Sequence, residues 1–341
     1  MPVTVERPFA QHAVADLRER RLRRGSIRDR GRRLTIGLVN NMPDAALSAT
    51  ERQFAGLLDA AAEDLDIQLS LWSLQSVDRQ PETRKAMAED YRSARELRGA
   101  PRDALIVTGA EPRAPDLREE LFWRELVALF DWSRARTVST VLSCLAAHAA
   151  VLHHDGILRR RLASKCSGVF ATRVVLEHEI VEGLAAGATP HSRLNGLDEG
   201  ELASNGYLTL TRSDRAGIDI FIKEGASLQV FLQGHPEYEA ETLAREYRRD
   251  LLRFLRGGVS EPPRIPFSYY PPPLAERIAA FVDRATASRI GDLSGFPPEA
   301  LAVTGAPWRA NSVRLFRNWL GVVARRKAAL DAPSSAARWG G

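Results

Sequence analysis

One cysteine stands where the sequence changes from a strand pattern to a helix pattern. Cys144 follows the apolar run TVSTVLS and precedes the Ala-rich run LAAHAAVLHH. A strand, a sharp turn and a helix in this order expose the residue at the turn and direct the positive end of the helix dipole at it. That dipole favours the thiolate, the nucleophilic form of cysteine. A lone cysteine is more often a small apolar side chain, so Cys144 needs partners before it can be assigned to chemistry.

The segment GHPEY (234–238) offers those partners. His235 and Glu237 lie two residues apart, just after the strand-like LQVFLQ. If the strand continues through them, their side chains share one face of it. Glu237 can then orient His235 as the base that activates a nucleophile. The alternative is a capped strand end with a partly buried histidine and a surface glutamate.

Strand-like and helix-like patterns alternate over the first 150 residues. This alternation predicts an α/β fold with right-handed crossovers and a mostly parallel sheet covered by helices on both faces. Functional side chains collect at the carboxyl ends of strands in such sheets, which is where Cys144 is expected. A capping box at Ser48 and Glu51 is expected to begin the first helix. The expected strands are 34–42, 67–74, 103–110 and 137–143, and the expected helices are 48–64 and 118–134.

The second half of the chain has a different pattern. We expect strands at 173–180 and 207–214, two strands within 218–238, and helices at 241–255 and 308–326. A Pro-rich segment, EPPRIPFSYYPPP, separates the last two helices. The expected organisation is an Arg-rich arm (1–33), a catalytic α/β domain (34–256), a Pro-rich strap with C-terminal helices packed on that domain (257–326), and a tail (327–341).

Composition limits the classes of function. The chain has 341 residues, of which 44% are hydrophobic, and its two cysteines are too few for a disulfide framework. No apolar run is long enough to cross a bilayer, so we expect a cytoplasmic protein without a membrane partner. The net charge of +5 comes from residues 1–33, which hold ten arginines and four acidic residues. The rest is nearly neutral, so no nucleic-acid partner is expected, and the arm is expected to be a solvated helical or frayed terminus.

Seven longer motifs stand in order along the chain. They are IGLVNNMPDAALSATERQF, IVTGAEPRAPDLREELFWREL, FDWSRARTVSTVLSCLAAHAAVLHHDGI, KCSGVF, PHSR, GHPEYEAETLAREYRRDL and WRANSVRLFRNWL. They resemble the successive motifs of the homoserine O-acyltransferase family, of the homoserine O-succinyltransferase type. The resemblance spans residues 34–325 and implies a class I glutamine amidotransferase-like fold. It also implies an enzyme of methionine biosynthesis, an acyltransferase that binds no cofactor beyond its acyl-CoA cosubstrate, and a homodimer.

The resemblance assigns roles to the residues already singled out. Cys144 would take the acyl group from succinyl-CoA or acetyl-CoA as a thioester and pass it to the hydroxyl of homoserine. His235 would activate first the thiol and then that hydroxyl, and Glu237 would orient His235. The backbone N–H of Leu145 is a natural oxyanion donor beside the turn.

The resemblance also implies substrate contacts. Lys165 of KCSGVF, Ser192 of PHSR and Arg249 of YRRD occupy the matching positions. Arg249 suits an α-carboxylate, and Glu246, almost one helical turn earlier, suits the ammonium group.

Two departures bear on specificity. The family usually has Cys-Trp-Gly-Ala-Gln at the turn, whereas this chain has Cys144-Leu-Ala-Ala-His148. His148 is expected to be a histidine satisfied by packing. At the position associated with acyl-CoA choice, commonly Glu or Gly, this chain has Arg113, whose charge would favour the carboxylate of a succinyl group.

Several alternatives stay open at this point. They are an acetyl donor, a paralogue that acylates another hydroxylated amino acid, a glutamine amidotransferase, and a non-catalytic binding protein. A glutamine amidotransferase is less favoured than an acyltransferase because the usual Gly-flanked cysteine is absent. No metal site is expected, since His153, His154, His178 and His191 lack dependable ligand spacing.

Overall fold

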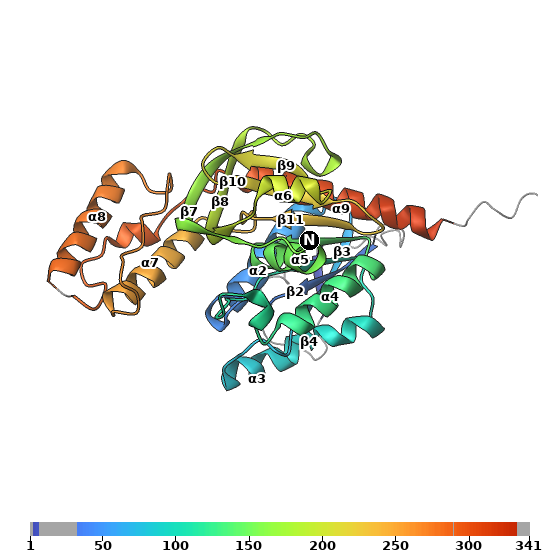
Figure 1. The fold of residues 1–341 in the computed structure, drawn as a ribbon, viewed down its shortest axis with the longest axis horizontal. Helices are drawn as coiled ribbons and strands as arrows, with labels where there is room; N and C mark the ends of the chain where they lie inside the picture. The colour runs from blue at the N-terminus through green and yellow to red at the C-terminus, as the bar shows by residue number, and fades with distance from the viewer. Residues whose placement is uncertain (1–2, 7–32, 289, 333–341) are drawn as a thin grey trace, which may run out of the picture.

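The central feature is one long sheet that is parallel in one half and antiparallel in the other (Figure 1). The computed structural model describes residues 3–6, 33–288 and 290–332. The strand order is β1-β3-β2-β5-β6-β11-β10-β9-β7-β8, with β4 paired to β3. The strands are β1 Val3–Glu6, β2 Arg33–Val39, β3 Asp66–Ser73, β4 Tyr91–Ser93, β5 Ala104–Val107, β6 Ser139–Ser143, β7 Arg160–Val174, β8 Gly187–Gly196, β9 Leu208–Ser213, β10 Gly217–Lys223 and β11 Leu228–Leu232.

The helices connect and cover these strands. The α-helices are α2 Asp44–Ala61, α3 Pro81–Asp90, α4 Trp123–Arg136, α5 Leu145–Asp155, α6 Glu199–Ser204, α7 Thr242–Leu255, α8 Pro272–Ala287 and α9 Arg309–Asp331. Short 3₁₀ turns are η3 Ala94–Gly99, η4 Leu117–Glu119, η5 Glu179–Val181 and η6 Pro298–Leu301. Among the described residues, no helix combines the length and the apolar composition needed to cross a membrane.

Apolar side chains on both faces of the parallel half explain its buried position. In β5, Ala104 and Ile106 pack into the cluster that contains α2 and α9, whereas Leu105 and Val107 pack into the cluster that contains α4 and α5. Alternate residues of a strand point to opposite faces, so helices cover both sides of the sheet. The expected α/β architecture with a mostly parallel sheet covered on both faces is confirmed.

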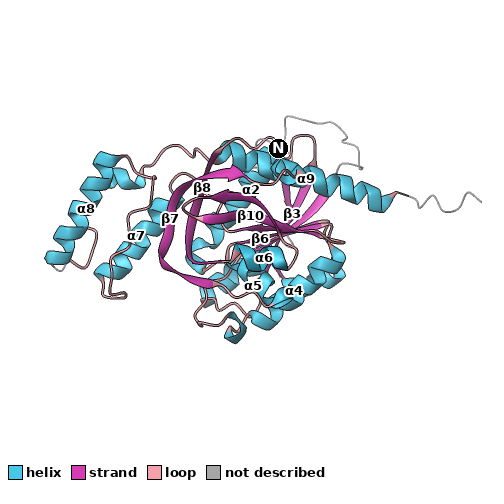
Figure 2. Cartoon of the chain, turned by 45° about the horizontal axis from the view of Figure 1, so that its top comes forward, coloured by secondary structure: helices cyan, strands magenta, loops and turns pink. Residues whose placement is uncertain are grey.

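The antiparallel half and the C-terminal helices extend this core. β10 pairs antiparallel with β11 and β9, and β7 pairs with both β9 and β8. Beyond them, α7 and α8 form an apolar cluster of their own, in which Tyr247 and Leu251 of α7 pack with Ile278 and Phe281 of α8. Figure 2 shows β7 and β8 beside α7, at the end of the sheet where the α7–α8 lobe projects. α9 returns to pack against α2.

Several element boundaries differ from those expected. α2 begins at Asp44, directly after Pro43, so Ser48 and Glu51 lie inside the helix and form no cap. The strand expected at 173–180 ends at Val174 and is the last part of β7. β8 was not expected as an element. α8 lies within 257–326, where C-terminal helices were expected without exact bounds, and α9 continues five residues past 326.

Part of the Arg-rich arm also belongs to the sheet. Residues 3–6 form β1, an edge strand parallel to β3, rather than a helical or frayed terminus. The arginine-rich part of the arm, 7–32, lies outside the described residues.

Candidate active site

Cys144 occupies a strained turn between β6 and α5. Its φ is 51° and its ψ is −108°, a left-handed conformation that is costly for a residue with a side chain. Its backbone N–H donates to the carbonyl of Leu232 at 2.7 Å, which ties the turn to the end of β11. β6 and β11 are adjacent and parallel, so the segment that follows β11 comes out beside Cys144. The expected exposed turn is therefore present, and the side chain of Cys144 is partly accessible.

His235 and Glu237 lie in that segment and contact each other. Nδ1 of His235 is 2.8 Å from Oε1 of Glu237, and the two side chains are only 8% and 5% exposed. The strand ends at Leu232, so this contact forms across a turn and not along a strand face as the spacing suggested. The carboxylate accepts, so Nδ1 carries the proton and Nε2 is left for another partner.

The charge of the site favours a protonated imidazole. Burial disfavours the charged form, but Glu237 and the neighbouring Cys144 outweigh burial and raise the pKa of His235 well above its ordinary value. Nε2 of His235 is buried, and none of the described residues forms a hydrogen bond of ordinary geometry with it. A protonated His235 is the counter-charge that a Cys144 thiolate needs for reactivity.

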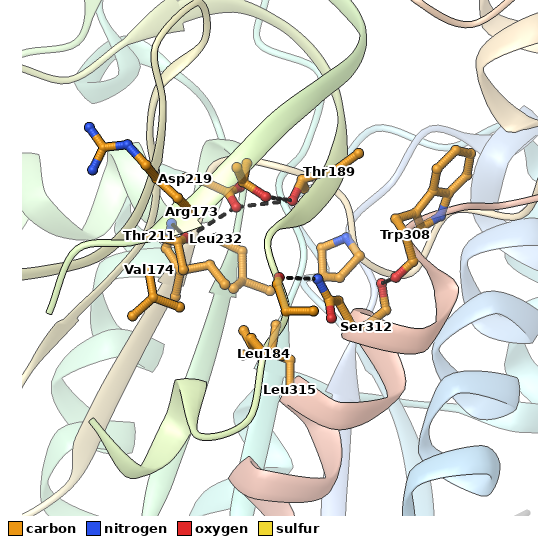
Figure 3. Close-up of a pocket in the computed structure, with 16 residues that line it drawn as sticks. Arg173, Val174, Leu184, Thr189, Thr211, Asp219, Leu232, Trp308, Ser312 and Leu315 are labelled. Atoms are coloured by element: carbon orange, nitrogen blue, oxygen red, sulfur yellow. Dashed lines mark hydrogen bonds between the residues drawn. The ribbon is translucent and has the colours of Figure 1, made fainter. Parts of the chain in front are cut away.

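Behind His235, a buried polar cluster supports the loop. The N–H of His235 donates to the carbonyl of Pro190 at 2.8 Å, which joins the loop to β8. Oδ2 of Asp219 accepts hydrogen bonds of 3.1 Å from the hydroxyls of Thr189 and Thr211, and Figure 3 shows these three side chains along the wall of a cavity of about 30 Å³, room for about one water molecule. A Cβ on Gly234 would lie 2.6 Å from Oδ1 of Asp219, so only glycine fits there.

The start of α5 supplies the candidate oxyanion donor. As the first residue of α5, Leu145 has an N–H with no carbonyl in a preceding turn to bond. Gly109, at the end of the segment after β5, packs so closely that a Cβ there would lie 2.4 Å from the Cβ of Leu145. The loop after β5 therefore forms one wall beside the N–H of Leu145.

Two of the expected substrate-binding residues meet at α7. Lys165 of β7 and Arg249 of α7 both bind Asp250: Nζ of Lys165 is 2.7 Å from Oδ2, and Nε of Arg249 is 2.9 Å from Oδ1. Burial opposes ionisation of Asp250, but the charges of Lys165 and Arg249 lower its pKa. We call these three side chains the cation cluster. The sequence analysis did not identify Asp250, although it directly follows Arg249.

Glu246 lies between this cluster and His235. Its Oε1 accepts a 2.8 Å hydrogen bond from the hydroxyl of Tyr238, and the Tyr238 ring stacks on His235 with centroids 4.3 Å apart. The charge of Glu246 contributes to raising the pKa of Arg249, against the opposing effect of burial. Sequence reasoning missed Tyr238, because an aromatic residue after His-x-Glu gives no signal of its own.

The remaining expected residues are more scattered. Ser192 lies on β8 opposite Ser167 of β7, two residues from Lys165. Arg113 lies in the loop after β5 with its side chain 76% exposed, and it pairs with Asp78 at 3.1 Å. His148 lies below the turn, where Nε2 is 3.1 Å from the side-chain oxygen of Gln233.

One group of potential metal ligands lies at the far end of α5. His153 and His154 face Asp131 of α4, and Nε2 of His153 is 2.8 Å from the Asp131 carboxylate. Burial, followed by the charges of Arg134 and His153, lowers the pKa of His154 to about 4. These residues lie at the opposite end of α5 from Cys144, so they take no part in the candidate active site.

Comparison with known proteins places the chain in a family. The model of the homoserine O-succinyltransferase family matches residues 12–329. The chain is 47% identical to a homoserine O-succinyltransferase of Methylorubrum extorquens over 87% of this chain and 89% of that protein. It is 48% identical to one of Rhodopseudomonas palustris over 84% of this chain and 87% of that protein. A putative GMP synthase subunit of Thermoplasma acidophilum has a similar structure, with a TM-score of 0.48 and 14% identity over 88% of this chain and 98% of that one. The chain belongs to the homoserine O-succinyltransferase family.

Proposed function

We propose that the chain transfers the succinyl group of succinyl-CoA to the hydroxyl of L-homoserine through a thioester on Cys144. The observation that carries this proposal is the position of Cys144: a strained turn at a helix N-terminus, beside a buried and charged His235–Glu237 pair. Covalent catalysis needs a nucleophile, a base and a group that orients the base, and these three residues supply them.

The first half-reaction acylates the cysteine. His235 begins the step protonated, its Nε2 carrying the proton of the Cys144 thiol, and the Cys144 thiolate attacks the carbonyl carbon of succinyl-CoA. The N–H of Leu145 stabilises the resulting oxyanion. The bond between that carbon and the CoA sulfur breaks, the CoA thiolate takes the proton from His235, and CoA leaves.

The second half-reaction transfers the acyl group. Homoserine enters, its hydroxyl gives its proton to His235, and the oxygen attacks the thioester carbon. The Sγ–carbon bond breaks and O-succinylhomoserine leaves, which restores the Cys144 thiolate and the protonated His235. Glu237 remains ionised and keeps Nδ1 protonated through both steps.

The charged side chains around the site suit the two substrates. Lys165 and Arg249 offer cations for carboxylates, and homoserine and the succinyl group each carry one. Oε2 of Glu246 is buried and makes no hydrogen bond within the described part of the chain, so it offers an acceptor for the ammonium group of homoserine. Arg113 is our candidate for a determinant of donor choice.

Mass spectrometry of the intact protein tests the mechanism. The wild type is mixed with succinyl-CoA or with acetyl-CoA, and homoserine is added afterwards. We expect an adduct of one succinyl group that homoserine discharges. Cys144→Ala should give no adduct, whereas the matched control Cys166→Ala should behave as the wild type, because burial raises the pKa of the Cys166 thiol.

The other outcomes each contradict part of the proposal. An adduct from acetyl-CoA alone would make the enzyme an acetyltransferase. An adduct that survives homoserine would indicate another acceptor. No adduct from either donor would contradict the cysteine mechanism.

The homodimer remains a prediction from the family resemblance, and the cytoplasmic location remains a prediction from the composition. Sedimentation equilibrium should give twice the monomer mass, and a monomer at all concentrations would contradict the homodimer.

A further inference from the structure

Tyr238 touches the catalytic base on one side and a helix glutamate on the other. Its ring lies nearly parallel to the His235 ring, at an interplanar angle of 19°. Its hydroxyl donates to Oε1 of Glu246 at 2.8 Å, and its carbonyl accepts from the Trp308 indole N–H at 2.8 Å. The side chain is buried. Tyr238 is therefore fixed at three points.

The other carboxylate oxygen of Glu246 is unpartnered. Oε2 is inaccessible to solvent and makes no hydrogen bond with any described residue. A buried polar atom of this kind calls for an explanation, because nearly all such atoms in folded proteins have a partner. Oε1 is held by Tyr238, so the orientation of Oε2 depends on the Tyr238 hydroxyl.

The hydroxyl remains a donor under all ordinary conditions. Burial, followed by the negative charges of Glu246 and Glu237, raises the pKa of Tyr238 well above its ordinary value. It therefore stays protonated and can donate to Oε1 of Glu246.

We propose that Tyr238 is a positioning residue with two separable roles: its ring packs against His235, and its hydroxyl fixes Glu246 so that Oε2 receives the ammonium group of the acceptor. This inference rests on the function proposed above. It assigns the hydroxyl to one half-reaction only, because the acyl group of acyl-CoA carries no ammonium group. The ring serves both half-reactions, because both need His235.

The chain offers a matched control for the hydroxyl. Tyr247, on the same helix as Glu246, has a buried hydroxyl with no hydrogen-bond partner among the residues that the structure describes. Tyr247→Phe removes a hydroxyl that holds nothing, whereas Tyr238→Phe removes one that holds Glu246 and leaves the ring in place.

The two half-reactions are measured separately by rapid quench and intact mass. For Tyr238→Phe we expect acylation of Cys144 by succinyl-CoA at the wild-type rate. We expect discharge by homoserine at low concentration to slow roughly ten- to hundredfold, which is the effect of losing a hydrogen bond to a charged group. Glu246→Gln should give the same pattern, and Tyr238→Leu should slow both half-reactions.

A second acceptor that lacks the ammonium group tests the role of the Tyr238 hydroxyl further. The preference for homoserine over this acceptor would not change if Tyr238 only stabilised the fold. The wild type should discharge to homoserine much faster than to 4-hydroxybutanoate, and Tyr238→Phe should lose most of that preference. Discharge by Tyr238→Phe at the rate of Tyr247→Phe, or an unchanged preference, would overturn the inference. Failure of the wild type to form any adduct would instead contradict the proposed function itself.

Discussion

The proposed catalytic centre, which is Cys144 with His235 and Glu237, and the cation cluster are neighbours, but they are built in opposite ways. At the centre, the side chains of His235 and Glu237 are less than a tenth exposed and each is fixed by buried contacts. In the cation cluster, the side chain of Arg249 is 61% exposed, and those of Lys165 and Asp250 are each 24% exposed. Buried charges interact strongly, and salt weakens their interaction little. The interactions of charges near water are screened by salt and by the solvent.

This difference in burial indicates different roles for the two regions. Removing either His235 or Glu237 leaves the charge of the other buried and uncompensated. Substitutions of these two residues should therefore cause large losses of activity. Arg249 is exposed and its ion pair with Asp250 contributes little to stability, so Arg249 is suited to exchanging Asp250 for a substrate carboxylate. Four predictions test the contrast, and they begin with the largest expected effect.

Replacing Glu237 by Gln should nearly abolish turnover. The amide keeps the shape of the side chain but removes the charge that raises the pKa of His235 and fixes its tautomer. We expect kcat to fall about 10³- to 10⁴-fold, as for other triads that lose this acid. Steady-state kinetics measure the loss, and Glu239→Gln, two residues on and paired with Arg52 at a more exposed position, is the control. Equal activity of the two variants would remove Glu237 from the mechanism.

Gly234→Ala should have the next largest effect. The new Cβ would lie 2.4 Å from Cγ2 of Thr189 and 2.6 Å from Oδ1 of Asp219, so the loop that carries His235 must move. A displacement near 1 Å at a catalytic group costs about 10²-fold in rate. The matched control is Gly225→Ala in the β10–β11 turn, where the nearest atom is 3.7 Å from the new Cβ. Activity of Gly234→Ala equal to that of the control would show that the buried cluster does not position His235.

The sequence alone predicted the centre better than its surroundings. The change from a strand pattern to a helix pattern singles out Cys144, and the two-residue spacing singles out His235 and Glu237. Both signals are local in the sequence. The contact between His235 and Glu237 was predicted for the wrong reason, since the strand ends at Leu232 and a turn brings them together.

Other features depend on contacts distant in sequence. Gly234 needs its small size because of Thr189 and Asp219, which come from other strands. Asp250 matters because Lys165 lies 85 residues earlier on β7. β1 could not be identified from four residues next to a charged arm, because its pairing with β3 decides its structure.

His148→Gln tests whether the burial of His148 affects the stability of the fold without affecting turnover. Burial, more than the charges of Arg193 and Arg159, lowers the pKa of His148 to about 4. The unfolded chain binds a proton below about pH 6.5, while the folded protein does not, so the free energy of unfolding falls as the pH drops. Between pH 7 and pH 5 this loss is about 2 kcal/mol.

Gln at position 148 does not titrate, and its amide can still donate to Gln233. We expect urea unfolding of the variant to lack that part of the pH dependence, with unchanged turnover at pH 7. The two proteins differ only at position 148, so the difference between the two curves isolates His148. Curves that stay parallel from pH 7 to pH 5 would mean that His148 is accessible to protons in the folded state.

The smallest effects should come from the cation cluster. Arg249→Ala and Lys165→Ala each remove one partly hydrated cation. We expect the KM for the substrate whose carboxylate that cation binds to rise about tenfold, with little change in kcat. The wild-type KM should itself rise with ionic strength, because salt screens exposed charges, and each variant should show a weaker dependence. The rate constant of acylation at saturating succinyl-CoA should not respond to salt, since it reports on the buried pair. Arg248→Ala, an exposed arginine next to Arg249 on α7, is the matched control. A salt-independent wild-type KM, or a loss in kcat as large as that of Glu237→Gln, would place the cation cluster inside the catalytic centre and end the contrast between the two regions.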